Sequence, residues 1–72
     1  MKARIRLDTL QDIRKFVDIT SKLDGKIVIT DNNGLCVNGR SMLGCMYSLE
    51  FDELWCESDK DIYASIRQFL YD

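Results

Sequence analysis

The chain has no histidine and no proline among its 72 residues. Without histidine it lacks the side chain that most often binds metal ions or moves protons near neutral pH. Its three cysteines, Cys36, Cys45 and Cys56, stand at wide spacings with no C-x-x-C pair, which does not suit a zinc or redox site. We therefore expect no metal and no cofactor, and we interpret the cysteines as reduced thiols that pack as small hydrophobic side chains.

A strong excess of one charge and long apolar runs are also missing. Lys and Arg number 10 against 12 Asp and Glu, and the net charge of −2 comes with no basic stripe that would attract a phosphate backbone. No apolar run approaches the ~20 residues needed to cross a bilayer, and the alternating start of the chain is unlike a secretion signal. The sequence predicts a cytoplasmic protein that binds neither nucleic acid nor membrane.

Recognisable enzyme signatures are absent as well. The sequence contains neither a glycine-rich phosphate-binding loop nor a nucleophile elbow. Its carboxylates are better interpreted as solvated helix faces and helix caps. We expect no enzymatic activity and no catalytic residue.

The first part of the chain reads as a strand followed by a helix. Residues 3–7 alternate apolar and charged side chains, which is typical of a half-buried strand. Thr9 stands three residues before Asp12 in an acidic form of the capping box, and apolar residues at helical spacing follow. The pattern predicts a helix over residues 10–23, with Gly25 in the left-handed conformation that ends helices.

The middle of the chain reads as a hairpin followed by a short helix. Residues 26–30 and 35–37 are two runs typical of strands, and the turn residues between them favour a hairpin. Ser41 can accept a hydrogen bond from the first turn of a helix of fewer than three turns.

The last part predicts a strand over residues 53–57 and a third helix after it. Ser58 stands three residues before Asp61, which is a second capping pattern of the same kind. An apolar stripe at helical spacing follows, made of Ile62, Ile66, Phe69 and Leu70.

The resulting βαββαβα order has no repeat or linker that would divide it, so it predicts a single domain over residues 1–72. Because a chain of this length holds one core, all three helices must cover the same face of the sheet. The predicted fold is α+β, an open-faced two-layer sandwich with a four-stranded antiparallel sheet and three helices on one face. The side chains expected to face the helices are Ala3, Ile5, Leu7, Ile27, Ile29, Leu35, Val37, Leu54 and Cys56.

Two segments resemble the family of the bacterial phosphocarrier HPr. Residues 21–29 begin S-K-L-D-G, similar to the S-K-F-x-[AS] that precedes the second strand in HPr proteins, and residues 37–44 read V-N-G-R-S-M-L-G, similar to V-N-x-K-S-I-M-G. Val37, Asn38, Ser41 and Gly44 match outright. The resemblance implies the same open-faced sandwich over essentially the whole chain.

The resemblance also implies one lost and one retained functional position. Counting back without gaps places the family's phosphorylated histidine at Thr9, and a threonine phosphoester cannot relay phosphate as a phosphoimidazole does. The family's regulatory serine, which an HPr kinase phosphorylates, matches Ser41. A histidine-lacking branch of the family, the catabolite-repression HPr-like proteins, shares this pattern and binds a transcriptional regulator. Capping of the helix explains Ser41 without any kinase, and the strong preference for serine at helix caps favours this structural explanation.

Two surfaces are candidates for partner binding. The resemblance implies that the short helix presents Met42, Leu43 and Met46 to partner proteins, with Arg40 beside them. On the sheet, Trp55 lies beside Arg4 and Arg6 if it points away from the helices, whereas a one-residue shift of register would bury it, and the sequence leaves both orientations open.

We therefore predict a non-catalytic HPr-like domain that acts through protein contacts and is regulated by phosphorylation at Ser41. Its expected partners are an HPr kinase or a transcriptional regulator, and its expected state is a monomer or weak homodimer. A phosphocarrier of the sugar phosphotransferase system, which the missing histidine disfavours, and a dimerisation module are the alternatives.

Overall fold

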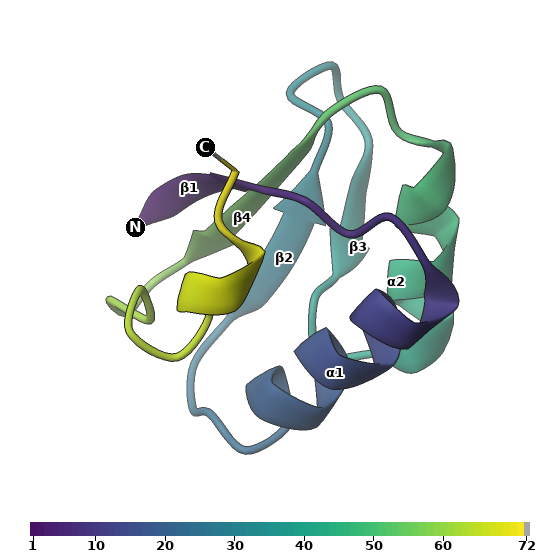
Figure 1. Ribbon diagram of the computed structural model, residues 1–72. Coiled ribbons are helices and arrows are strands. Elements are labelled where there is room, and N and C mark those ends of the chain that lie inside the picture. Colours follow the sequence, from purple (N-terminus) through teal and green to yellow (C-terminus); the bar gives the residue numbers. More distant parts are fainter. Residues whose placement is uncertain (72) are drawn as a thin grey trace.

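Four short strands form one antiparallel sheet in the computed structural model, which describes residues 1–71 (Figure 1). In chain order the elements are β1 (Lys2–Ile5), α1 (Leu10–Thr20), β2 (Ile27–Thr30), β3 (Cys36–Asn38), α2 (Met42–Tyr47), a 3-10 turn (Ser48–Glu50), β4 (Leu54–Ser58) and a second 3-10 turn (Arg67–Phe69). The strand order across the sheet is β1-β4-β2-β3. The predicted α+β class and the four-stranded antiparallel sheet are confirmed.

The sheet buries one face against the helices. Cross-strand neighbours such as Ala3, Cys56 and Ile29 share the covered face, because side chains on paired strands point the same way at each register position. Of the side chains expected to face the helices, seven are buried: Ala3, Ile5, Leu7, Ile27, Ile29, Leu54 and Cys56. All of them except Ala3 join α1 and α2 side chains in one hydrophobic core.

The prediction for Leu35 was wrong. Its side chain is 56% exposed, although the half-buried Val37 two residues later packs against the core. Leu35 lies between the hairpin turn and β3, where its carbonyl accepts from the amide of Asp31 and its own amide donates to the Asp31 carboxylate. The alternation of apolar and polar residues along a strand does not show which of its positions the helices cover.

Helix α1 begins where the sequence indicated and ends earlier. Thr9 is the N-cap and forms a complete capping box with Asp12. The prediction that the helix reaches residue 23 was wrong by three residues, because after Thr20 the amides of Lys22 and Leu23 bond three residues back and tighten the chain into turns. Gly25 does adopt a positive φ of 90°, in the loop that leads to β2.

The predicted third helix is absent from the described residues. Ile62, Ile66 and Phe69 are buried, as the apolar stripe required, but the backbone between β4 and the second 3-10 turn forms only turns. The cap that was expected to start this helix is used otherwise. Ser58 is the last residue of β4, and its hydroxyl donates to the carbonyl of Lys60.

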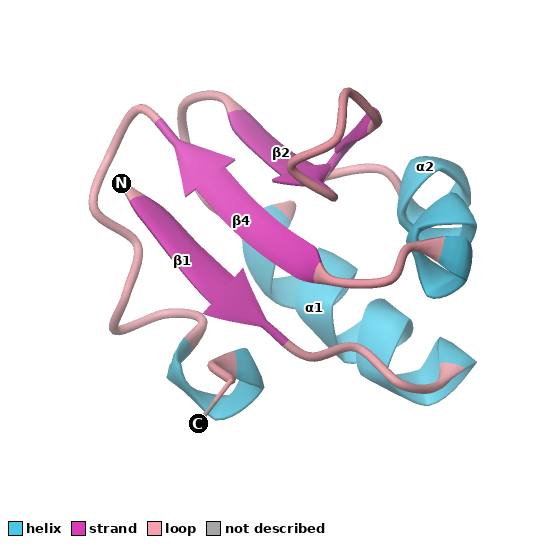
Figure 2. Ribbon diagram, turned by 90° about the horizontal axis from the view of Figure 1, so that it is seen from above, coloured by secondary structure: helices cyan, strands magenta, loops and turns pink. Residues whose placement is uncertain are grey.

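The end of the chain instead closes the β1 edge of the sheet. Leu70 forms a bridge with Ile5, the amide of Tyr71 donates to the carbonyl of Arg4 at 3.0 Å, and the amide of Arg6 donates to the carbonyl of Phe69 at 2.7 Å. Figure 2 shows the last 3-10 turn beside the end of β1. These bonds satisfy edge groups that a helix lying on the sheet would have left to solvent.

Among residues 1–71, neither α-helix has the length and apolar character that crossing a membrane would require.

Candidate functional site

Thr9 lies at the amino end of α1, as predicted, where it serves as a cap. Its hydroxyl accepts a hydrogen bond from the amide of Asp12 at 3.1 Å. The Asp12 carboxylate in turn accepts from the amides of Asp8 at 3.0 Å and Thr9 at 3.3 Å. The Asp12 carboxylate therefore occupies the amides of Asp8 and Thr9 and places negative charge at the amino end of α1.

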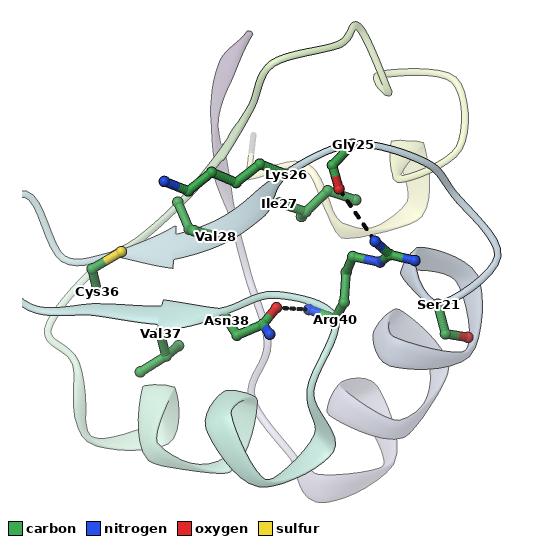
Figure 3. A pocket seen from close by; sticks show the side chains of 9 residues that line it. All are labelled: Ser21, Gly25, Lys26, Ile27, Val28, Cys36, Val37, Asn38 and Arg40. Carbon is green, nitrogen blue, oxygen red and sulfur yellow. Dashed lines mark hydrogen bonds between the residues drawn. The ribbon is translucent and has the colours of Figure 1, made fainter.

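Ser41 is the N-cap of α2, and its hydroxyl accepts a hydrogen bond from the amide of Gly44 at 3.1 Å. The residue is half-buried. The preceding Arg40 extends toward the loop before β2, where its guanidinium donates to the carbonyl of Gly25 at 3.3 Å, as Figure 3 shows. Arg40 thus lies at the border of the short helix, directed toward that loop.

Helix α2 presents an apolar surface to solvent. Cys45 is fully buried and Met42 packs against the core, so these two side chains anchor the helix. Leu43 is 68% exposed and Tyr47 63% exposed, and Met46 and Leu49 are also exposed. We call Leu43, Met46, Tyr47 and Leu49 the α2 surface.

The sequence identified only half of this surface. Leu43 and Met46 were predicted as contact residues, and Met42 was predicted with them but is turned inward. Tyr47 and Leu49 were missed. The signal that could have found them is the run of large apolar side chains that continues past Met46 into the following 3-10 turn.

Trp55 faces away from the helices, which decides the orientation that the sequence left open. It is the cross-strand neighbour of Arg4 and Thr30 on the uncovered face of the sheet. Lys2 lies over its ring, with Nζ 5.5 Å from the ring centroid, and reaches on to the side-chain oxygen of Asn32 at 2.5 Å. Trp55 is consequently half-buried, and its indole Nε1 is buried without a hydrogen-bond partner within the described chain.

Arg4 and Arg6 meet at a different aromatic ring. Their guanidinium carbons lie 4.1 Å and 4.9 Å from the ring centroid of Tyr71, near the end of the chain. Arg4 also pairs with Glu53 at 3.6 Å. Of the predicted trio, Arg4 borders Trp55, while Arg6 lies beyond the end of β1.

The three cysteines differ in environment. Cys36 is exposed, and Cys45 and Cys56 are buried. Burial raises the pKa of both buried thiols from 9.0 to about 11. Within residues 1–71, no three His, Cys, Asp or Glu side chains gather closely enough to hold a metal ion.

A groove of about 590 Å³ lies over the β2–β3 hairpin and is lined by residues of both strands. It extends from Cys36, past Val37 and Asn38, to Arg40, and Lys26 and Val28 of the neighbouring chain segment complete it (Figure 3). Its lining contains two cations and no carboxylate.

No protein-family model, no curated protein and no solved structure matched the chain. The functional argument therefore rests on the residues and the geometry above.

Proposed function

We propose that the chain is an HPr-like domain that works by binding other proteins through the α2 surface. The observation that carries this proposal is the exposure of Leu43, Met46, Tyr47 and Leu49 within seven consecutive residues. Large apolar side chains that gather in this way commonly mark protein-binding sites, and methionine adapts readily to different partners.

The HPr-like assignment is supported by the order of the elements and by two helix starts. The strands and the two α-helices follow the βαββαβ order expected for that family, with turns in place of its last helix. Thr9 and Ser41, which align with the family's two phosphorylated positions, are the N-caps of α1 and α2.

The α2 surface can be tested by affinity capture with matched variants. A cytoplasmic extract of the source cell is passed over immobilised wild type, a Leu43→Asp/Tyr47→Asp variant and a Tyr63→Asp control, which changes an exposed tyrosine outside the surface. Proteins that bind wild type and the control, and are lost with the double variant, are expected. If the same proteins bind all three, the α2 surface is not the contact site.

We propose that phosphorylation at Ser41 regulates partner binding by the α2 surface. Ser41 immediately precedes α2, so a phosphate there adds negative charge next to Leu43. Incubation with a purified HPr kinase and ATP should label wild type, and Ser41→Ala should remain unlabelled. Absence of label on wild type removes the regulatory step and leaves the contact surface to be judged by the capture experiment.

Phosphate transfer by the chain itself is disfavoured because the sequence has no histidine. Incubation with the general phosphotransferase enzyme and phosphoenolpyruvate should therefore leave the mass of the protein unchanged. Acid-labile phosphate on the chain would favour the phosphocarrier alternative.

The dimerisation alternative has less support. Lys2 lies over Trp55, and the pairs Lys2–Glu57 and Arg4–Glu53 border it, so little of the indole ring is free for a second copy. Sedimentation of wild type and Trp55→Ala should give the same mass. A lower mass for Trp55→Ala would restore the dimerisation role.

A further inference from the structure

Two asparagines of the chain are followed directly by glycine. Asn33-Gly34 lies in the turn between β2 and β3, and Asn38-Gly39 lies at the end of β3. In such a pair the backbone nitrogen of the glycine can attack the side-chain carbonyl carbon of the asparagine, because glycine has no Cβ that restricts the backbone or obstructs the approach. The reaction requires a glycine amide that is not bonded within the protein and an asparagine side chain that can turn toward it.

The pair Asn38-Gly39 is protected on both counts. Gly39 is buried, and its amide donates to the carbonyl of Ile27 at 2.8 Å. The side-chain oxygen of Asn38 accepts from the amide of Arg40 at 2.9 Å, which holds the carboxamide in place (Figure 3). Attack at this pair requires both bonds to open first, so folding slows the reaction here.

The pair Asn33-Gly34 has neither form of protection. Both residues are exposed. Within residues 1–71 the Gly34 amide has no acceptor and the Asn33 side chain has no hydrogen-bond partner, while the Asn33 backbone amide donates to the Asp31 carboxylate at 2.8 Å. Gly34 has a positive φ of 105°, which favours glycine at this position, so the turn itself supplies the reactive neighbour.

We propose that Asn33 is a deamidation site, at which the turn converts without an enzyme to an aspartyl or isoaspartyl form. The Gly34 amide gives its proton to hydroxide, and its nitrogen bonds to the side-chain carbonyl carbon of Asn33. The bond between that carbon and the side-chain nitrogen breaks, ammonia leaves, and a five-membered succinimide ring forms. Water then adds to one of the two ring carbonyls and opens the ring. One water is consumed and one ammonia released, with no oxidation or reduction.

The product changes both the charge and the backbone of the turn. The new carboxylate adds one negative charge to the net charge of −2. When the ring opens to isoaspartate, one extra carbon enters the backbone between the amides of residues 33 and 35, which both donate to the buried Asp31 carboxylate. Isoaspartate is the substrate of protein isoaspartate methyltransferases, so this class of enzyme would recognise the altered turn. The inference is independent of the α2 surface.

The test compares folded protein with protein in guanidinium chloride, both kept in mildly alkaline buffer. Deamidation raises the mass by about 1 Da. Trypsin releases residues 27–40 as one peptide that contains both pairs, and its fragment ions assign the change to Asn33 or Asn38. In folded protein Asn33 should react about tenfold faster than Asn38 or more, whereas in guanidinium chloride the two rates should agree within about threefold.

The matched control is Asn33→Gln, which keeps an exposed carboxamide but would have to close a six-membered ring, a much slower reaction. It should stay unmodified at position 33. A protein isoaspartate methyltransferase with S-adenosylmethionine should methylate the 27–40 peptide of aged wild type and not that of aged Asn33→Gln. Equal rates at Asn33 and Asn38 in folded protein, or reaction at Asn33 only after denaturation, would overturn the proposal.

Discussion

Phe16 of α1 and Phe69 near the end of the chain meet edge to face, with ring centroids 5.3 Å apart and planes at 78°. Both side chains are buried, so the last turn is joined to the first helix through the centre of the core. This contact links segments more than fifty positions apart in the sequence.

Phe69→Ala should therefore destabilise the whole domain, because it leaves a cavity at this contact. The expected loss is about 3 kcal/mol in the free energy of unfolding, measured by urea denaturation. Tyr63→Ala, which truncates an exposed aromatic ring in the same segment, should cost no more than about 0.5 kcal/mol. Equal losses for the two variants would mean that residues 59–71 do not pack as described.

Thr20 connects α1 to the loop between β3 and α2 by a buried hydrogen bond. Its hydroxyl donates to the carbonyl of Gly39 at 2.8 Å. The isosteric change Thr20→Val leaves this carbonyl unpaired and should cost about 1–3 kcal/mol in thermal or urea unfolding. Thr30→Val removes two exposed hydrogen bonds of the hydroxyl, one donated to the carbonyl of Leu35 and one accepted from the amide of Asn32, and should cost about 0.5 kcal/mol. A smaller loss for Thr20→Val than for Thr30→Val would contradict this assignment.

The cysteines should divide into one reactive and two protected thiols. At pH ~8 a disulfide reagent should modify Cys36 rapidly, and Cys45 and Cys56 only after denaturation. Cys36→Ser should abolish the rapid phase. A rapid phase that persists in Cys36→Ser would show that a buried thiol opens to solvent.

The buried thiols also predict a loss of stability at high pH. In the unfolded chain these thiols ionise near their ordinary pKa of 9.0, whereas in the folded protein burial raises the pKa to about 11. The folded state therefore holds more protons between these values, and its stability falls as the pH rises through this window. Unfolding of Cys36→Ser followed across the same window isolates the two buried thiols from the exposed one. A stability that rises through the window would contradict the assignment.

The unpaired indole Nε1 of Trp55 predicts that the ring is replaceable. Trp55→Phe removes some apolar contact, which lowers the free energy of unfolding. It also removes a buried N–H donor that has no partner in the described chain, which raises the free energy of unfolding by about 1 kcal/mol. We expect the free energy of unfolding to stay within ~0.5 kcal/mol of wild type, measured by urea denaturation. A loss above ~2 kcal/mol would show that the N–H is hydrogen-bonded in solution.

Features that depend on neighbouring residues were predictable from the sequence. The capping interactions of Thr9 and Ser41 each reach three residues along the chain, and both helices start where these residues indicated. The hairpin turn was predictable for the same reason.

Features set by distant contacts were not predictable. Ser58 resembles a helix cap, but its amide donates to the carbonyl of Met1 and holds it in the sheet. Ile62, Ile66 and Phe69 are buried as predicted, but the predicted helix does not form. Apolar side chains can reach the core from turns as well as from a helix, so their burial does not determine the backbone conformation.

In the candidate surfaces, too, local patterns were predictable and the orientation of individual side chains was not. The helical pattern indicated that α2 has one buried side, yet whether Met42 or Leu43 faces the core depends on how the helix packs against α1 and β3. The orientation of Trp55 depends on the register of β4 with β1 and β2, which a period of two cannot fix.

The proposed contact through α2 is tested most directly by photocrosslinking in the source cell. A photoreactive phenylalanine analogue at Leu43 should give a covalent adduct with a partner protein, and the same analogue at the exposed Tyr63 should give none. Adducts from both positions in equal yield, or none from Leu43, would contradict the account.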